Sequence, residues 1–546
     1  MIENTIGDVL DEITAKYPEN DALVYVDRDL RLNYRKFTER CNRLARGLIE
    51  LGIKKGDKVS VWSNNVPEWV YLQFATAKIG AILVTVNTYY KSHELEYLLK
   101  QSDSTTLFLV DGVKSDEYIQ TLNDVVPELA TSQPGHLVCE KLPLLKNIIS
   151  MQGTHIDGGF VMQDVYDLAS NVSDTERQAR QASLSKDDVI NMQYTSGTTG
   201  FPKGVQLSHY SILNNAYYVG ENLGLTNQDR YLIPVPFFHC FGCVLSTLNC
   251  VTHGATMVPI ESFDPEMVLK AVEAEKCTAI NGVPTMFIAE LNVENFDKYD
   301  LSSLRTGIMA GATCPVEVMK SVQTKMHCQE ITIAYGLTEF SPVITQTLTD
   351  DSLERRTETV GHVIPGVKAM VVDPDTGEEL PPGEAGELVA SGHGMMKGYF
   401  KNEDATAASI RDGWIHTKDL ATMDESGYFK IIGRIDDMII RGGENIYPRE
   451  IEEFLFTNDK INDAAVVGVP SEHYGEEVAV FIELHDGENM TVDEVKDFCT
   501  NKISRFKIPK HIFFVDEYPL TASGKIQKFV LRDMAKIQLQ KESICS

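Results

Sequence analysis

A glycine-rich stretch near the middle of the chain has the composition of a phosphate-binding loop. Residues 194–205 read YTSGTTGFPKGV, with three glycines and hydroxyl side chains between them. Glycine lets backbone N–H groups approach a ligand closely, the hydroxyls add donors, and Lys203 adds a positive charge. These groups suit a polyphosphate. The stretch is not a Walker A loop, because Lys203 precedes a glycine rather than serine or threonine, and Pro202 lacks an N–H donor.

A second group of residues could hold a purine and a metal ion. In the segment 333–340, IAYGLTEF, Tyr335 offers an aromatic face, Thr338 a hydroxyl and Glu339 a carboxylate of the kind that Mg²⁺ prefers. By itself this string is weak evidence, since many turns look like it. Three further charged candidates lie downstream: Asp419, Arg434 and Lys525.

An aromatic segment at 235–242, VPFFHCFG, has two interpretations. Phe238 and His239 could end a core strand, with the histidine satisfied internally, or they could form the wall of an apolar pocket. Cys240 and Cys243 form a C-x-x-C, but a zinc or redox site needs a second ligand pair or a thioredoxin-like setting. The sequence has no second C-x-x-C, so these cysteines are predicted to be small packing residues.

The elements that must position these residues follow a β-α-β-α order. Helical spacing of apolar residues predicts helices at 34–51, 68–78 and 90–101, and short apolar runs predict strands at 58–62, 81–86 and 105–110. This order indicates a parallel sheet covered by helices. A strand is expected at 188–193 before the glycine-rich stretch, and a helix at 207–217 after it. Residues 111–185 are too weakly patterned for their elements to be assigned.

Two later segments, 278–286 and 307–315, share one pattern: a short apolar strand followed by small residues and a proline. In open α/β sheets, ligands sit at the carboxyl ends of such strands. Residues 360–400 alternate strand-like pieces with turns and predict a small β-rich subdomain. From about residue 437 the pattern is that of a separate α+β unit, with strands at 464–469, 478–484 and 512–515 and helices at 449–456 and 492–502.

Length and composition bound the fold and the partners. With 546 residues, two or more domains are expected, and a hydrophobic fraction of 43% supports large cores. The 50 basic and 79 acidic residues give a net charge of −29, which disfavours nucleic acid and anionic lipid as long-range partners. No apolar run is long enough for a transmembrane helix. An acidic start and scattered cysteines favour a cytoplasmic protein with reduced thiols.

In this order and at these distances, the motifs resemble the signatures of the adenylate-forming (AMP-binding) superfamily. Residues 238–242, 441–448 and 504–510 look most like medium- or long-chain fatty acyl-CoA synthetases. The resemblance covers nearly the whole chain and implies an α/β fold in two domains. A large N-terminal domain (1–435) of helix-covered sheets with a β-rich subdomain would bind acyl group and ATP. A small, mobile α+β C-terminal domain (436–546) would carry the catalytic lysine.

The resemblance also implies roles for individual residues. Lys525, Thr338 and Glu339 are expected to be catalytic, and Glu339 is also the expected metal ligand. Phe238 and His239 are expected to border the acyl pocket. The residues expected to bind ATP are Thr195, Ser196, Gly197, Thr198, Thr199, Gly200, Lys203, Gly311, Ala312, Tyr335, Gly336, Asp419, Arg434 and Lys525.

Two further regions are expected to serve the second half of the reaction. Gly442 and Gly443 would lie beside the CoA tunnel, and Asp436 would be the hinge between the domains. The chain departs from the family at one position: a glycine usually precedes the ribose-binding aspartate, whereas Lys418 precedes Asp419 here.

The reaction that the resemblance implies has two steps and uses ATP, Mg²⁺ and CoA. A carboxylate is a poor acyl donor, so ATP would convert a fatty acid to an acyl-adenylate, and CoA would then take the acyl group as a thioester. The first step brings together two anions, which positive charge must stabilise. Lys525 would bridge the carboxylate and phosphate oxygens, and rotation about Asp436 would later withdraw it.

Other functions stay open at this point. The chain could load a carrier protein, or it could use an aryl acid. A non-catalytic binding protein is disfavoured because Lys525, Glu339 and Asp419 are all present, and a P-loop kinase is disfavoured by the position of Lys203. The expected partners are a fatty acid, ATP and CoA, with no nucleic acid; peripheral membrane contact and oligomer formation are left open. Acetylation of Lys525 would remove its charge.

Overall fold

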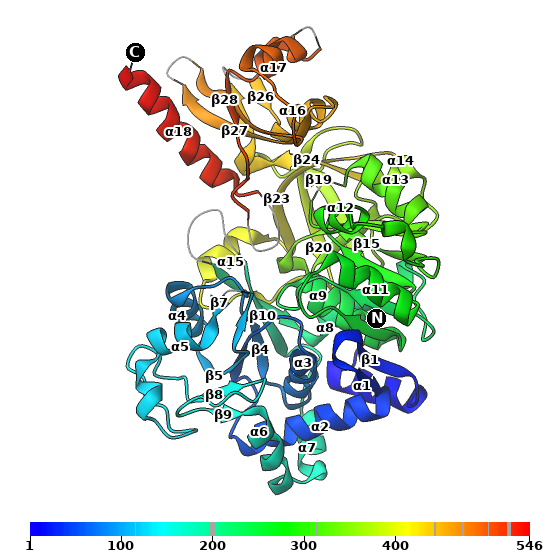
Figure 1. Cartoon of the computed structure of the whole chain (residues 1–546), viewed down its shortest axis with the longest axis vertical. Coiled ribbons are helices and arrows are strands. Elements are labelled where there is room, and N and C mark those ends of the chain that lie inside the picture. The colour runs from blue at the N-terminus through cyan, green and yellow to red at the C-terminus, as the bar shows by residue number, and fades with distance from the viewer. Residues whose placement is uncertain are drawn as a thin grey trace. The chain divides into compact units, whose positions relative to one another are not determined.

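The structure is a computed structural model of the whole chain. It describes residues 1–114, 116–195, 202–312, 314–441, 444–471, 474–500, 502–520 and 526–545. The chain forms two compact units (Figure 1). Unit 1 contains residues 1–368 and 390–415, and unit 2 contains residues 369–389 and 416–546. The predicted boundary between residues 435 and 436 describes where the chain would rotate. The division into compact units does not test such a rotation, so the boundary stays a prediction.

An eight-stranded sheet in unit 1 carries the glycine-rich stretch. Its order is β21-β11-β10-β4-β3-β5-β8-β9. The bounds are β3 (Lys58–Trp62), β4 (Ile82–Thr85), β5 (Ser104–Leu109), β8 (Asn147–Ser150), β9 (Phe160–Val161), β10 (Val189–Thr195), β11 (Lys203–Ser208) and β21 (Gly398–Tyr399). The strands from β10 to β9 are parallel, as predicted, whereas β11 runs antiparallel to both β10 and β21.

The helix predicted at 207–217 is confirmed, but the sequence did not predict the strand that precedes it. The chain first returns as β11, and α8 (His209–Asn222) begins only at His209. Val205 and Leu207 are buried in the sheet, and the Ser208 hydroxyl caps the helix by accepting from the Ser211 N–H at 3.2 Å. The stretch is therefore the connection of a β-hairpin, not a strand-to-helix turn.

A nine-stranded sheet in unit 1 carries the second group of candidates. Its order is β18-β17-β16-β15-β14-β12-β13-β1-β2. The bounds are β1 (Asp21–Tyr25), β2 (Leu30–Asn33), β12 (Arg230–Ile233), β13 (Thr256–Pro259), β14 (Ala279–Gly282), β15 (Thr306–Ala310), β16 (Glu330–Gly336), β17 (Val343–Gln346) and β18 (His362–Val363). The strands from β16 to β1 are parallel, and the two edges are antiparallel.

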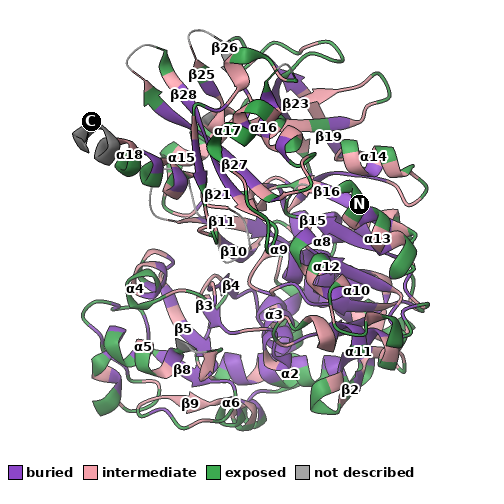
Figure 2. Cartoon of the chain, turned by 45° about the horizontal axis from the view of Figure 1, so that its top comes forward, coloured by how far each residue is buried: buried purple, intermediate pink, exposed green. Residues whose placement is uncertain are grey.

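Helices flank both sheets of unit 1. They are α1 (Ile6–Lys16), α2 (Tyr34–Glu50), α3 (Pro67–Ile79), α4 (Ser92–Gln101), α5 (Tyr118–Val125), α6 (Met162–Leu168), α7 (Asp174–Ala182), α8, α9 (Cys240–Gly242), α10 (Asn249–His253), α11 (Pro265–Glu275), α12 (Pro284–Leu291), α13 (Val316–Lys325), α14 (Leu353–Glu358) and α15 (Glu403–Ser409). The three helices and three strands predicted in the first 110 residues are confirmed. In α2 the predicted apolar positions are buried, from Tyr34 to Leu48. Figure 2 shows the strands largely in purple, with green on outward helix faces.

Unit 2 contains a small antiparallel-dominated sheet with helices on it. The sheet order is β26-β25-β28-β27, with β29 beside β28. The bounds are β25 (Ile439–Arg441), β26 (Glu444–Ile446), β27 (Ile461–Ser471), β28 (Gly475–Leu484) and β29 (His511–Phe514), with α16 (Pro448–Leu455), α17 (Val492–Cys499) and α18 (Lys528–Cys545). Two apolar clusters use alternate residues of β27: Val466 in one and Val467 in the other. This period-two pattern gives the sheet two buried faces.

The strands between residues 360 and 400 exist but do not share one sheet. β18 pairs with β17, and β21 pairs with β11. A five-stranded sheet has the order β19-β20-β23-β22 with β24 beside β23. Its bounds are β19 (Val367–Val372), β20 (Gly386–Gly392), β22 (Ile410–Arg411), β23 (Trp414–Met423) and β24 (Phe429–Arg434).

Within the described residues, no helix has the length and hydropathy needed to cross a membrane.

Candidate active site

The flanks of the glycine-rich stretch are held at the end of the β10–β11 hairpin. Thr195, the last residue of β10, pairs with Lys203, the first residue of β11. The Tyr97 hydroxyl, from α4, donates to the carbonyl oxygen of Pro202 at 3.1 Å. The predicted ATP residues Ser196, Gly197, Thr198, Thr199 and Gly200 lie outside the described residues.

The Tyr335–Glu339 candidates lie on a second hairpin. β16 ends at Gly336, and a short 3₁₀ turn, η6 (Thr338–Phe340), leads into β17. A Cβ added to Gly336 would lie 1.8 Å from the Pro342 carbonyl oxygen, so only glycine fits this crossing. Tyr335 and Thr338 are half-buried, as is Glu339.

A buried asparagine from α8 fixes the same hairpin. The Asn215 side-chain amide donates to the carbonyl oxygens of Phe340 (3.3 Å) and Val343 (2.8 Å). Its carbonyl oxygen accepts from the Val343 N–H at 3.1 Å. Asn215 is fully buried, so these bonds form without competition from water. The helix that follows the first hairpin thus anchors the second.

Glu339 and Lys203 both contact the side chain of Tyr399. The Tyr399 hydroxyl donates to Glu339 Oε1 at 2.8 Å. Lys203 Nζ lies over the Tyr399 ring, 5.0 Å from its centroid. The backbone of Glu339 is also held, because its carbonyl oxygen accepts from the Met396 N–H at 2.9 Å. The structure therefore brings together a predicted phosphate-binding lysine and the predicted metal ligand, although 136 positions of sequence numbering separate Lys203 from Glu339 (339 minus 203).

The aromatic segment lies beside the 3₁₀ turn. His239 caps α9, its Nδ1 accepting from the Phe241 N–H at 3.3 Å, and Phe238 and His239 are half-buried. The next residue, Cys240, is fully buried and interacts with Thr338 and Glu339. Burial raises the pKa of the Cys240 thiol, while hydrogen bonds with Gln193 and Thr338 act in the opposite direction. The segment predicted to border an acyl pocket thus adjoins the predicted catalytic turn.

The C-x-x-C cysteines behave as buried packing residues. Cys243 is almost completely buried, and its sulfur accepts a hydrogen bond from Gln193 Nε2 at 3.0 Å. Burial raises the pKa of the Cys243 thiol to about 12. A thiol that stays protonated at neutral pH is a poor metal ligand and nucleophile. The burial agrees with the packing role predicted from the sequence.

Gly311 and Ala312 follow the carboxyl end of β15 and are exposed. Gly311 adopts φ +92°, a left-handed conformation that favours glycine. The neighbouring strand β16 ends at the predicted purine-binding Tyr335 and Gly336. Both groups therefore lie at the same edge of parallel strands, which is where ligands bind in such sheets.

In unit 2, Asp419 and Arg434 pair across neighbouring strands. They are directly opposite in β23 and β24, and Arg434 Nε lies 3.1 Å from Asp419 Oδ1. Lys418 adopts φ +60°. Its N–H donates to Glu387 Oε1 at 3.0 Å, and the Asp419 N–H donates to Thr417 Oγ1 at 3.1 Å. The backbone before Asp419 thus has the left-handed conformation that a glycine would adopt.

Several predicted residues lie outside the described part of the chain. These are Lys525, Gly442 and Gly443. The backbone of Asp436 belongs to a 3₁₀ turn, η7 (Ile435–Asp437), between β24 and β25. The structure does not test the roles predicted for these residues.

Glu339 is a suitable ligand for Mg²⁺, though it would need partners. Within the described residues, no cluster of three or more His, Cys, Asp or Glu side chains could hold a metal ion. A single carboxylate fits Mg²⁺ nevertheless, because this ion is commonly bound by one or two carboxylates together with substrate phosphates and water. The donor set therefore fits a metal ion that arrives with a nucleotide.

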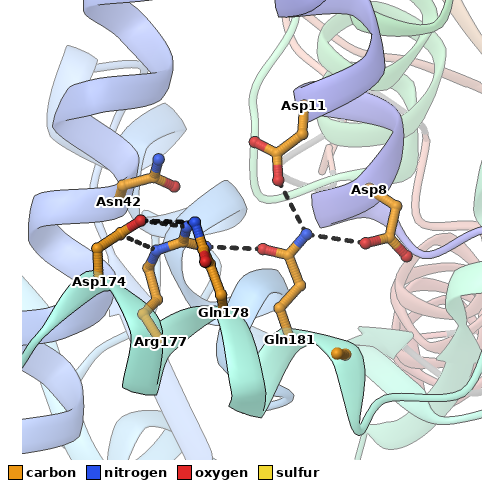
Figure 3. Close-up of a pocket in the computed structure, with 8 residues that line it drawn as sticks. Asp8, Asp11, Asn42, Asp174, Arg177, Gln178 and Gln181 are labelled. Carbon is orange, nitrogen blue, oxygen red and sulfur yellow. Dashed lines mark hydrogen bonds and ion pairs between the residues drawn. The ribbon is translucent and has the colours of Figure 1, made fainter.

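A separate polar pocket lies among α1, α2 and α7 (Figure 3). Its volume is about 440 Å³. Gln181 joins its walls, because its Nε2 donates to Asp8 Oδ1 (2.8 Å) and Asp11 Oδ2 (2.9 Å) and its Oε1 accepts from Arg177 at 2.8 Å. Asp11 also pairs with the fully buried Lys78 at 2.5 Å. These hydrogen bonds and this ion pair join α1 to α3 and α7, so the pocket walls contribute to holding α1 in place.

Sequence reasoning missed Tyr399 and Asn215. Tyr399 contacts Glu339 across 60 residues of sequence, and Asn215 contacts Phe340 across 125. Neither lies in a pattern that signals chemistry.

Comparisons with known proteins match nearly the whole chain. The family model for AMP-binding enzymes matches residues 10–400, and that for the AMP-binding enzyme C-terminal domain matches residues 450–525. The chain is 54% identical over 534 residues to YngI of Bacillus subtilis (strain 168), provisionally named as an acyl-CoA synthetase, covering 98% of this chain and 97% of YngI. It is 42% identical over 540 residues to the mitochondrial medium-chain acyl-CoA ligase ACSF2 of Danio rerio, covering 98% and 89%.

A solved structure shares the architecture. The anthranilate CoA ligase AuaEII in complex with anthranoyl-AMP superposes with a TM-score of 0.84 at 26% identity, covering 99% of both chains. The likeness confirms the predicted α/β fold class, with a large N-terminal part of sheets and helices and a smaller C-terminal α/β part.

Proposed function

This chain belongs to the AMP-binding enzyme family, and from that premise we propose that it is a fatty acid–CoA ligase that forms AMP and pyrophosphate. The observation that carries the proposal is the meeting of Lys203, Thr338 and Glu339 in unit 1, around Tyr399 and Cys240. These side chains supply a cation, a hydroxyl and a carboxylate beside the end of the glycine-rich hairpin. That combination suits the polyphosphate of ATP.

The first half-reaction transfers AMP to the carboxylate of the substrate. An anionic carboxylate must attack an anionic α-phosphate, so groups that stabilise the added negative charge lower the barrier. In this proposal Lys203 and residues 195–200 bind the β- and γ-phosphates, and Thr338 binds the α-phosphate. Tyr335 and Gly336, with Gly311 and Ala312, bind the purine, and the Asp419–Arg434 pair binds the ribose.

Mg²⁺ is part of the proposal, with Glu339 as the protein ligand. When bound with ATP, the ion would neutralise phosphate charge. The chain's own contribution is to hold the Glu339 carboxylate in one orientation, through Tyr399 and through the backbone bond from Met396.

The second half-reaction transfers the acyl group to CoA. Lys525, which serves the adenylation step, would obstruct an incoming thiol. We infer that the part of the chain beyond Asp436 rotates, withdraws Lys525 and presents the Gly442–Gly443 region to CoA. The boundaries 1–435 and 436–546 belong to this proposal.

The substrate is proposed to be a medium- to long-chain fatty acid. The ACSF2 relatives are named as medium-chain acyl-CoA ligases, and the half-buried Phe238 and His239 directly precede Cys240, which interacts with Thr338 and Glu339 of the predicted catalytic turn. An aryl acid is the second candidate, because the matched AuaEII structure is an anthranilate CoA ligase. A cytoplasmic location is part of the proposal; the ACSF2 relatives are named as mitochondrial, so the compartment stays a prediction.

The deciding experiment measures pyrophosphate release with ATP, Mg²⁺ and straight-chain acids of four to eighteen carbons, with and without CoA. CoA-dependent turnover that peaks at one chain length would support the ligase and identify its substrate. Adenylate formation without CoA-dependent turnover would point to a carrier-protein thiol. Turnover with anthranilate or benzoate alone would favour the aryl-acid function, and no turnover with any acid would reject the proposal.

Replacing Lys525 tests the catalytic assignment directly. A charge at about 4 Å in an effective dielectric of about 20 is worth roughly 4 kcal/mol, or about three decades of rate. Lys525→Ala should therefore lower the single-turnover rate of acyl-adenylate formation by about 10³-fold. The matched control is Lys536→Ala, a half-exposed lysine of α18 that pairs only with Asp533 among the described residues. A near wild-type rate for Lys525→Ala would refute the assignment.

A further inference from the structure

Tyr399 lies where three parts of unit 1 converge. It ends β21 and pairs with Val205 of β11, the strand that leaves the glycine-rich stretch. Its N–H donates to Thr406 Oγ1 of α15 at 2.9 Å, and its side chain is 8% exposed. A Cβ on the preceding Gly398 would lie 2.9 Å from Thr406 Cγ2, so glycine permits this close packing. The position of Tyr399 is therefore fixed by a strand on one side and a helix on the other.

The two ends of the side chain contact two different predicted ligands. The hydroxyl donates to Glu339 Oε1 at 2.8 Å, which occupies one carboxylate oxygen and restricts rotation of the carboxylate. The ring faces the Lys203 ammonium at 5.0 Å, within the range of a cation–π interaction. Burial raises the pKa of the Tyr399 phenol, so the hydroxyl stays protonated and can act as the donor.

We propose that Tyr399 is a positioning residue that orients Glu339 for the metal ion through its hydroxyl and Lys203 for the phosphates through its ring. The proposal rests on the proposed function, because it assumes that Glu339 and Lys203 bind metal and ATP. Partners that orient a metal ligand typically change metal affinity by 10- to 100-fold when they are removed. The two roles belong to separate parts of one side chain, so separate substitutions can distinguish them.

Tyr399→Phe removes the hydroxyl and keeps the ring. We expect it to weaken the binding of Mn²⁺, used as a paramagnetic probe with α,β-methylene-ATP, by about 10-fold or more. Binding of the ATP analogue without metal should change by less than about twofold, because the ring still faces Lys203. Tyr399→Leu removes both groups and should weaken both kinds of binding.

The matched control is Tyr34→Phe. Tyr34 is fully buried, and its hydroxyl donates to the Ala255 carbonyl oxygen at 2.7 Å and more weakly to the Cys250 carbonyl oxygen at 3.4 Å. It belongs to α2, and its hydrogen-bond partners, Ala255 and Cys250, are not candidate site residues. Metal and nucleotide affinity should be unchanged in this variant, whatever its effect on thermal stability.

The readouts are Mn²⁺ binding by electron paramagnetic resonance, analogue binding by calorimetry, and the Mg²⁺ concentration that gives half-maximal pyrophosphate release. Wild-type Mn²⁺ affinity in Tyr399→Phe would overturn the inference and leave the proposed function standing. Equal weakening of metal and metal-free nucleotide binding in Tyr399→Phe would also overturn it, since the hydroxyl would then have only a structural role. No binding of the metal–nucleotide pair by the wild-type chain would reject the proposed function and the inference together.

Discussion

Lys418 has a left-handed backbone conformation that is unusual for lysine and that hydrogen bonds stabilise. A left-handed conformation costs a non-glycine residue about 1–2 kcal/mol, yet Lys418 adopts φ +60°. Its N–H donates to the buried Glu387, and Glu387 also binds His416 Nδ1 at 2.8 Å. These bonds hold the turn before Asp419 in the shape that glycine would give. The departure from the family pattern is therefore expected to be compatible with the predicted ribose role of Asp419.

His209 should make the native state sensitive to mild acid. It is fully buried at the start of α8, and burial lowers its pKa to about 4, although Asp188 and Asp8 partly oppose this. Between pH 6.5 and 4 the unfolded chain binds a proton here and the native chain does not, so the free energy of unfolding falls as pH falls. Above pH 6.5 the stability is fully present. The loss should total about 3 kcal/mol, with about 2 kcal/mol already lost at pH 5.

His209→Asn separates this effect from other acid titrations. Its side-chain oxygen can replace the Nδ1 acceptor that receives the Ile6 N–H at 3.2 Å, but asparagine does not titrate. Urea unfolding at pH 8 and pH 5 should therefore show a loss about 2 kcal/mol smaller in the variant than in the wild type. Equal losses in both chains would contradict the prediction.

At the scale of elements, the candidate site is built from two hairpins and the helix between them. The β10–β11 hairpin presents Lys203, the β16–β17 hairpin presents Thr338 and Glu339, and α8 joins them through Asn215. Helix α8 begins directly after β11, so a buried hydrogen-bonded side chain links the first hairpin to the second.

Gly336→Ala should disrupt the second hairpin. The added methyl group would lie 1.8 Å from the Pro342 carbonyl oxygen, and overpacking of this kind costs about 1–3 kcal/mol or more. We expect a lower midpoint of thermal unfolding and weaker ATP binding. Gly433→Ala is the control, because no atom lies within 4 Å of the position that a Cβ would take there and its φ is not left-handed. Similar stabilities for the two variants would argue against the predicted clash.

The sequence predicted elements better than it predicted contacts. The strands β3, β4 and β5 and the helix α2 have clear apolar periodicity, and all were found. β11 was missed because KGVQLS alternates over only a few residues before the helical composition begins. The convergence of Lys203 with Glu339 comes from packing between two different sheets, which local patterns do not contain. Tyr399 could not be assigned for the same reason, since its partners come from other parts of the chain.

At the scale of the whole molecule, the proposed reaction requires two arrangements of one chain. The predicted hinge residue Asp436 lies in the 3₁₀ turn η7, between β24 and β25 of different sheets. A short turn between two sheets can absorb a change in backbone angles without breaking strand pairing. The alternation between adenylation and thioester formation is therefore expected to depend on backbone freedom at this turn.

Asp436→Pro should separate the two half-reactions. Proline fixes φ near −65°, so the chain could retain one arrangement and lose the other. We expect acyl-adenylate formation within about threefold of the wild type and thioester formation reduced by about 100-fold or more, measured in single turnovers. Asp436→Ala, which keeps backbone freedom, should retain both steps. Equal loss of both steps in the proline variant would reject the hinge.

The burial of the cysteines has a practical consequence for observing such a rotation. Nine cysteines are buried, and the tenth in the sequence, Cys545, lies near the end of the chain. Burial also raises the pKa of thiols such as Cys277, to about 12, and maleimide dyes react with accessible thiolates. Once Cys545 is replaced by serine, a donor–acceptor dye pair on two introduced surface cysteines, one within residues 1–435 and one within residues 436–546, would report distance changes during turnover, with the native apolar core left unaltered.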